Sequence, residues 1–452
     1  MIADIEENIH KKLDAIKKTD GKIRAFVDIF NDCTERAQEI AKKTKAGRAG
    51  KLAGTVISVK GNICIKGRRA TCSSKMLENY IAPYNATVID RLLAEDAIII
   101  GSTNMDEFAC GSDTTSSAFY PTRNPHDTTR VAGGSSGGAA ASVAAGMCDA
   151  ALGSDTGGSV RCPASFCGVT GMKPTYGTVS RYGLIDMAMS LEQIGAMTGN
   201  GKDAIELNRK TLEVIGGPDK RDAQCNYSIG KMTKRTHAKP PTIGIINQFF
   251  DACDKAVSNT VMRQVDKLGY EVMELSLEET KYLIPTYYLI MCTEFASAMQ
   301  KYDGYKYGQK ADIAKSLAES VSEARSNHFG KEVKRRILLG TYVSMKEVQD
   351  DWYTRALGVR KALTQKFEKF LGEVDLIASP TMPTVAWKIG EKATPTEMYA
   401  ADILTVTANL TGLPAISVNA GEIGGLPVGM QLMGRKFEEG LVYETAAMAM
   451  DK

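Results

Sequence analysis

Hydrophobic and polar residues along the first part of the chain follow the periods of helices and of buried strands. Residues 1–50 have helical spacing and are rich in Lys and Ala, and the opening MIADIEENIHKKLDAIKK predicts an amphipathic helix. Residues 55–59 form an apolar run that predicts a buried strand. Residues 86–95 have helical spacing again, and residues 97–100 predict a second buried strand that Gly101 stops. This order indicates a βαβ-like unit in a parallel or mixed sheet.

The remainder of the chain continues both patterns. Residues 101–200 hold most of the Gly-Ser-Thr clusters, but the apolar segments between the clusters argue against a flexible linker and indicate rigid loops inside a core. Residues 217–241 are polar and predict a surface connection. Residues 242–277 predict strand, helix and strand, and residues 285–372 predict mostly helices. Short strands are predicted at the end, in VDLIASP, PAISVNA and PVGMQLMG.

Composition and charge narrow the class of protein. The chain has 452 residues, of which 43% are hydrophobic and 24% charged, as is ordinary for a globular protein in water. Its 56 Lys and Arg against 53 Asp and Glu leave a formal charge of +3, which gives no general signal for binding nucleic acid. The start has no signal-peptide pattern, and no apolar stretch is long enough for a membrane span. We therefore expect a cytoplasmic protein.

Several familiar sites are missing from the sequence. The ten cysteines are widely spaced and form no C-x-x-C pair, so we expect reduced thiols packed as small apolar groups. None of the four histidines lies in a G-x-S-x-G or H-E-x-x-H pattern, which argues against a Ser-His-Asp hydrolase and a zinc enzyme. The glycine-rich AGGSSGGAAAS lacks the G-K-[ST] ending of a phosphate-binding loop. Serine, glycine and lysine remain as the candidates for chemistry.

The run Thr156-Gly157-Gly158-Ser159 is a tight turn without bulky side chains. Backbone N–H groups in such a turn can converge on one point, as an oxyanion hole requires, and Ser159 would lie beside that point. An ordinary glycine turn is an equally good interpretation of these four residues alone.

A serine nucleophile needs a base, and lysine is the alternative to histidine. Lysine must lose its proton to act as a base, and burial disfavours the ammonium form. Lys60 ends the apolar strand TVISV and is followed by Gly61, which is a suitable place. Considered alone, a lysine at a strand end is more often just solvated.

Three motifs together carry a family resemblance. GGSSGG, DTGGSVR and the lysine of SVKGN resemble the amidase signature family, and PASFCGVTGMKPTYGTVSRYG strengthens the match. Ser159 lies 24 residues after Ser135 and 99 after Lys60, which is the spacing that this family shows. The resemblance covers essentially the whole chain and implies an α/β fold, a central mixed β-sheet flanked by helices on both sides. We expect a single amidase domain made of an N-terminal helical segment at 1–50, a signature core at 51–216 and a C-terminal α/β and helical part at 242–452.

The resemblance also implies catalytic roles. Ser159 attacks the carboxamide carbon, and Ser135 passes the proton between Ser159 and Lys60. In the family the residue matching Ser135 follows a cis peptide bond, here Gly134–Ser135, and Ser136 supports the network. The backbone of the glycine turn holds the oxyanion. Ammonia leaves, and a second acceptor resolves the acyl-enzyme.

Within the family, the chain is most similar to the branch whose amidase supplies ammonia to a tRNA-dependent amidotransferase. Four segments carry this similarity: STNMDEFACGSD, GVTGMKPTYGTVSRYGLI, FGKEVKRRILLGTY and MYAADILTVTANLTGLPAIS. The branch uses glutamine, so Arg336 is implied to bind the α-carboxylate and Asp402 the α-ammonium, with Tyr288 in the same pocket. Considered singly, each is a surface charge or a core tyrosine, and Arg335 is an alternative to Arg336. The family's common R-Q-P is R-C-P here, at 161–163, which we expect to alter packing slightly without removing activity.

The resemblance implies partners as well, namely the amidotransferase subunits B and C in a heterotrimer. The larger partner, B, binds the misacylated tRNA and uses ATP and Mg²⁺ to activate it, and the small partner, C, stabilises the amidase. Ammonia then converts Glu-tRNA(Gln) or Asp-tRNA(Asn), or both, to Gln-tRNA(Gln) and Asn-tRNA(Asn). This chain has no cofactor or metal motif of its own. Two alternatives remain open: a stand-alone hydrolase of small amides, and a non-catalytic scaffold of the tRNA complex, against which the intact Ser-Ser-Lys set argues.

Overall fold

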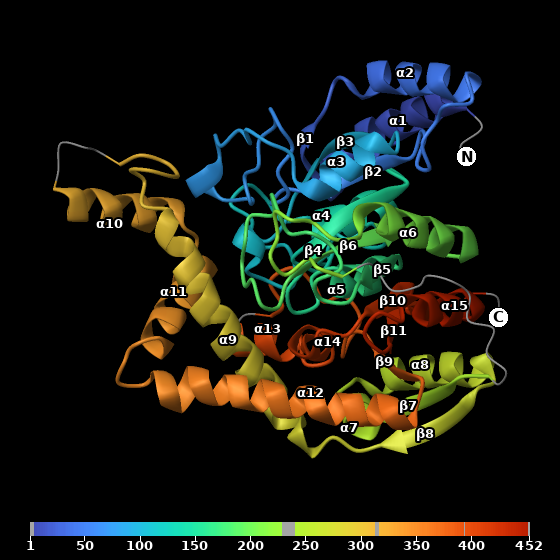
Figure 1. Ribbon diagram of the computed structural model, residues 1–452, viewed down its shortest axis with the longest axis vertical. Helices are drawn as coiled ribbons and strands as arrows, with labels where there is room; N and C mark the ends of the chain where they lie inside the picture. Colours follow the sequence, from blue (N-terminus) through green and yellow to red (C-terminus); the bar gives the residue numbers. More distant parts are fainter. Residues whose placement is uncertain (1–3, 228–239, 312–315, 393, 451–452) are drawn as a thin grey trace.

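A computed structural model describes most of the chain, and Figure 1 shows its arrangement. The described residues are 4–227, 240–311, 316–392 and 394–450. The predicted surface connection at 217–241 therefore lies partly outside them. The described strands form one eleven-stranded sheet in the order β1-β3-β2-β4-β6-β5-β10-β11-β9-β7-β8.

The strands of this sheet are short and mostly buried. They are β1 Phe26–Ile29, β2 Val56–Lys60, β3 Ile98–Thr103, β4 Ala150–Asp155, β5 Thr170–Lys173, β6 Gln193–Thr198, β7 Thr242–Ile246, β8 Glu271–Leu275, β9 Leu376–Pro380, β10 Ala415–Ile423 and β11 Leu426–Met433. The α-helices are α1 Ile5–Ile23, α2 Cys33–Lys45, α3 Thr87–Ala94, α4 Gly137–Ala144, α5 Arg161–Cys167, α6 Lys202–Ile215, α7 Asn247–Asp251, α8 Lys255–Leu268, α9 Leu283–Ala298, α10 Leu317–His328, α11 Lys331–Val343, α12 Arg355–Glu373, α13 Pro395–Ala400, α14 Val406–Thr411 and α15 Glu439–Ala449.

Helices cover both faces of the sheet because alternate residues of each buried strand point to opposite sides. On β2, Ile57 and Val59 face the cluster that contains α3, α6, α8 and α15, whereas Val56 faces the cluster of α1, α2, α4 and α5. Helices α9, α12 and α14 cover that second side of the sheet in its C-terminal half. The mixed sheet with helices on both sides was predicted and is confirmed. Strand β2 runs parallel to β3, which also confirms the βαβ-like unit.

Two local predictions were wrong, and both concern the edge of the sheet. Residues 1–50 are not helical throughout, because Phe26–Ile29 forms β1 and pairs antiparallel with β3. Gly101 does not stop the second strand, since β3 continues to Thr103. Gly101 lies opposite Ile29, and a Cβ atom on it would overlap the carbonyl oxygen of Asp28. Glycine here permits β1 to approach closely instead of ending the strand.

The sheet brings the loops of the signature region to one place. Strands β2 and β4 are parallel neighbours, so their C-terminal ends, at Lys60 and Asp155, lie at the same edge. Ser135 lies in the loop before α4 and follows a cis peptide bond from Gly134, as expected. The turn at 156–159 connects β4 to α5.

Three further observations bear on the class of protein. The ten cysteines all lie among the described residues and form no disulfide. In the described ranges, no cluster of His, Cys, Asp and Glu side chains is arranged to hold a metal ion. No helix in that part of the chain combines the length and apolar character that crossing a bilayer requires.

Candidate active site

Lys60 is fully buried and faces hydroxyl groups. Its Nζ lies 2.8 Å from Ser135 Oγ, 2.9 Å from Ser154 Oγ and 3.3 Å from the Ser154 carbonyl oxygen. Asn62 holds the same serine, since its Nδ2 donates to Ser154 Oγ over 3.0 Å. The structure therefore joins two of the three predicted catalytic residues directly, Lys60 and Ser135.

The surroundings of Lys60 favour its neutral form. Burial lowers the pKa of Lys60 to about 7, while the carboxylates of Asp106 and Asp155 partly oppose this effect. Lys60 forms no ion pair with any described residue, because the groups within reach of Nζ are hydroxyls and a carbonyl. A substantial fraction of the side chain is consequently unprotonated at neutral pH, as a base requires.

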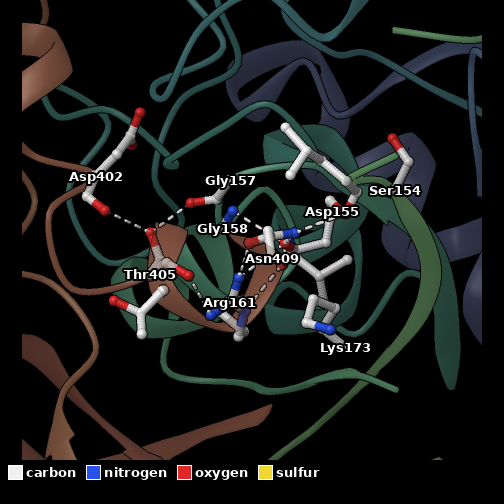
Figure 2. A network of polar contacts seen from close by, with 12 residues as sticks. Ser154, Asp155, Gly157, Gly158, Arg161, Lys173, Asp402, Thr405 and Asn409 are labelled. Carbon is white, nitrogen blue, oxygen red and sulfur yellow. Dashed lines mark hydrogen bonds and ion pairs between the residues drawn. The ribbon is translucent and has the colours of Figure 1, made fainter. Parts of the chain in front are cut away.

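The turn at 156–159 is anchored by a buried ion pair. Asp155 accepts hydrogen bonds from the N–H of Gly158 over 2.9 Å and of Val160 over 3.0 Å. Arg161 donates to both oxygens of Asp155, and it also donates to Thr405 O, Gln431 Oε1 and Asn409 Oδ1. Burial alone would raise the pKa of Asp155, but Arg161 outweighs it and lowers the pKa to about 2. Figure 2 shows this network.

The anchoring decides which N–H groups of the turn are available to an oxyanion. The Gly158 N–H already donates to Asp155, whereas those of Thr156, Gly157 and Ser159 have no hydrogen-bond acceptor among the described residues. Gly158 has φ +136°, a conformation that favours glycine, and a Cβ atom on it would overlap the Thr405 hydroxyl. Three of the four predicted oxyanion groups thus remain available as donors, and the fourth supports the turn.

Ser159 lies at the end of this turn and is 9% exposed, while Ser135 and Ser136 are fully buried. The backbone N–H of Ser136 donates to the carbonyl oxygen of Ser159 over 3.2 Å, which holds the two loops together. Ser136 Oγ donates to the Ser154 carbonyl oxygen over 3.2 Å. The hydroxyl of Ser159 has no hydrogen-bond partner in the described part of the chain, and it is the partly exposed hydroxyl of the set.

A second cluster comes from the C-terminal half. Ser112 Oγ donates to Asp402 Oδ1 over 2.8 Å, and the Tyr288 hydroxyl donates to Asp402 Oδ2 over 2.9 Å. Burial raises the pKa of Asp402 to about 6, although these two hydrogen bonds oppose the increase. Tyr288 stacks on Tyr399 with ring centroids 4.0 Å apart. The structure thus brings Asp402 and Tyr288 together, as the predicted pocket requires.

Arg336 completes this cluster, and its neighbour does not. Arg336 is 3% exposed and lies over the rings of Tyr288 and Tyr399 at 5.4 and 5.6 Å, while its Nε donates to Glu332 over 2.9 Å. The side chain of Arg335 is 46% exposed and pairs with Glu332 from the outside. The choice of Arg336 over Arg335 is supported by this burial.

Several contributing residues were not predicted from the sequence. Ser154 contacts Lys60, Ser112 contacts Asp402, and Glu332 contacts Arg336. Glu332 carried a signal, since it precedes Arg336 by four residues on one helix, which is the spacing of a side-chain pair. Ser112 carried no such signal, because 290 residues separate it from Asp402. Cys162 of the R-C-P segment is buried with Phe166, Met382 and Trp387 in a small apolar cluster.

Comparisons with known proteins agree with this geometry. The amidase family profile matches residues 7–443. The chain is 46% identical over 445 residues to the A subunit of glutamyl-tRNA(Gln) amidotransferase from Thermoanaerobacter pseudethanolicus, covering 96% of this chain and 90% of that protein. It is also 46% identical over 452 residues to the protein of the same name from Methanosarcina mazei, covering 98% and 92%. The crystal structure of the protein of that name from Thermotoga maritima matches with a TM-score of 0.80 at 36% identity, covering 98% of this chain and 91% of that one.

Proposed function

This chain belongs to the amidase family, and from that premise we propose that it is the glutamine-hydrolysing subunit of a tRNA-dependent amidotransferase. The similarity to the amidotransferase proteins extends over nearly the whole chain. One structural observation carries the chemistry: fully buried Lys60 lies 2.8 Å from Ser135 Oγ at the edge where the Ser159 turn begins. A buried, neutral lysine on a serine hydroxyl is the arrangement that a Ser-Ser-Lys relay needs.

The proposed reaction proceeds in two halves. Ser159 Oγ attacks the side-chain carboxamide carbon of glutamine, Ser135 takes its proton, and Lys60 Nζ accepts the proton of Ser135. The N–H groups of Gly157 and Ser159 stabilise the oxyanion that develops. The C–N bond then breaks, the proton returns through Ser135 to the leaving nitrogen, and ammonia departs. Water attacks the glutamyl ester of Ser159 by the same relay, releasing glutamate and regenerating the hydroxyl.

The second cluster fits the two charged groups of glutamine. The carboxylate of Asp402 lies beside the Tyr288 hydroxyl and can bind the α-ammonium. The Nη2 group of Arg336 donates to no described residue, and Nη1 has only the thioether of Met291 at 3.8 Å. These donors suit the α-carboxylate, because a guanidinium can bind a carboxylate with two hydrogen bonds. We assign glutamine recognition to Asp402, Arg336 and Tyr288 on this basis.

The proposal includes partners and a place of action. We propose a heterotrimer in the cytoplasm with a tRNA-binding subunit and a small stabilising subunit, the B and C partners expected above. The tRNA-binding subunit holds the misacylated tRNA, uses ATP and Mg²⁺, and receives the ammonia for the amidation of Glu-tRNA(Gln) or Asp-tRNA(Asn). We also propose that the chain is one domain, since a single sheet takes strands from all three of the segments predicted from the sequence.

The test is glutamine-dependent amidation by the assembled complex. We expect the purified chain to hydrolyse glutamine weakly. Adding both partner subunits with ATP, Mg²⁺ and misacylated tRNA should raise that rate, because docking shifts the population of the competent site. A ¹⁵N label in the amide of glutamine should appear in the aminoacyl-tRNA. Full turnover of simple amides by the free chain would favour a stand-alone amidase. Amidation without any glutamine hydrolysis by this chain would favour a scaffold.

A further inference from the structure

The peptide unit between Gly157 and Gly158 is held at both of its polar ends. Its N–H, on Gly158, donates to Asp155 Oδ1 over 2.9 Å, and its carbonyl oxygen, on Gly157, accepts a hydrogen bond of 2.6 Å from the Thr405 hydroxyl. The N–H and C=O of a trans peptide point in opposite directions within one plane. Two bonds on opposite sides therefore fix the orientation of that plane (Figure 2).

The fixed plane lies between the N–H groups assigned to the oxyanion. Those of Gly157 and Ser159 flank it, and neither donates to a described residue. Rotating the central peptide would turn both flanking groups, because each shares a Cα atom with it. The Thr405 hydroxyl can thus set the direction of the oxyanion donors without contacting the substrate itself.

The turn has little room for another position. A Cβ atom on Gly158 would overlap the side chain of Thr405, and one on Gly157 would overlap the ring of Tyr287. The backbone of the turn accordingly lies in direct contact with two side chains from the C-terminal half. Glycine at both positions is what permits this approach.

Thr405 also belongs to the segment that carries Asp402. Its backbone N–H donates to the Asp402 carbonyl oxygen over 3.0 Å, and its hydroxyl lies 3.1 Å from the same oxygen. Its own carbonyl oxygen accepts from Arg161 Nη1 over 2.8 Å, and Arg161 pairs with Asp155. The hydrogen bonds form a closed ring from Asp155 through the turn to Thr405 and back through Arg161.

From this ring we propose that Thr405 is a positioning residue, which aligns the oxyanion donors of the 156–159 turn with the Asp402 side of the glutamine pocket. The proposal rests on the proposed glutaminase function. The hydroxyl acts on the transition state, where charge develops on oxygen, and much less on the ground state. Removing it should therefore lower kcat and leave KM for glutamine nearly unchanged.

The experiment compares Thr405→Val with Thr405→Ser in the assembled complex. Valine keeps the shape and loses the hydroxyl, so kcat for glutamine should fall about tenfold to a hundredfold, as expected for misplaced catalytic groups. Serine keeps the hydroxyl and should stay within about threefold of the wild type. The matched control is Thr411→Val, since the Thr411 hydroxyl is also buried in α14 but donates to Thr407 O, away from the turn.

Two binding measurements separate positioning from general damage. The aldehyde analogue of glutamine forms a hemiacetal with Ser159 whose oxygen needs the oxyanion donors, so its affinity should fall in parallel with kcat in Thr405→Val. Affinity for glutamate, which needs only the pocket, should not change. If Thr405→Val does not fold, as judged by its Tm, Thr405→Ala provides the same comparison.

The outcomes are distinct. Wild-type kcat in Thr405→Val, an equal loss in Thr405→Ser, or an equal loss in Thr411→Val would each overturn the positioning role. Absence of glutamine hydrolysis in the wild-type complex would instead overturn the proposed function itself.

Discussion

Two regions of this molecule bury a cation, and they treat its charge in opposite ways. Around Lys60 the contacts are the hydroxyls of Ser135 and Ser154 and a carbonyl oxygen, and burial lowers the pKa to about 7. Around Arg336 a carboxylate, Glu332, lies 2.9 Å away and two tyrosine rings face the guanidinium. Hydroxyl surroundings make a buried lysine a base, whereas an acidic partner and aromatic faces keep a buried arginine charged.

The largest effect should come from removing the base. Lys60→Met should lower glutaminase turnover by several orders of magnitude, because the three members of the relay act as one unit. The control is Lys173→Met, since Lys173 is also fully buried with its pKa lowered to about 7 but donates only to Pro174 O among described residues. Comparable losses in both variants would show that burial of a lysine, and not its contact with Ser135, matters.

Removing the anchor should change binding more than chemistry. Arg336→Ala should raise KM for glutamine about a hundredfold, since a two-hydrogen-bond contact with a carboxylate is lost. Amidation driven by added ammonia should be nearly unaffected. The neighbouring Arg335→Ala removes an exposed guanidinium and should change KM less than about twofold. Equal losses with glutamine and with ammonia in Arg336→Ala would indicate misfolding or a role at a contact between subunits.

The smallest predicted effect is that of pH, and it separates the two regions. Lys60 gains a proton as pH falls through about 7, so kcat should decrease about tenfold per pH unit below that value. Asp402 gains a proton as pH falls through about 6 and loses its attraction for an ammonium, so KM should rise only below that pH. In Asp402→Asn the change in KM should vanish and the change in kcat should remain. A kcat independent of pH between 5 and 8 (roughly the range around both pKa values) would contradict the base role.

The sequence predicts the region of Lys60 better than that of Arg336, and the reason is physical. Lys60, Ser135 and Ser159 lie on loops next to buried strands and within contiguous motifs, so pattern and spacing locate them. The contacts of Asp402 come from Ser112 and from Tyr288 on α9, and these depend on how distant helices pack. Most strands were predicted because their apolar runs are buried on both faces. Strand β1 was missed because only its first residue, Phe26, is buried, so no apolar period marks it. The catalytic roles themselves stay predictions.

The central claim, that Ser159 is the nucleophile of a glutamine-hydrolysing relay, is tested most directly by trapping the acyl-enzyme. The complex turning over glutamine is quenched in acid and digested with trypsin. Cleavage after Arg130 and Arg161 releases one peptide that contains Ser135, Ser136, Ser142, Ser154 and Ser159. Fragmentation of this peptide in a mass spectrometer should place a glutamyl group on Ser159, and the group should be missing from Ser159→Ala. A glutamyl group on another serine, or undiminished glutamine turnover by Ser159→Ala, would contradict the account.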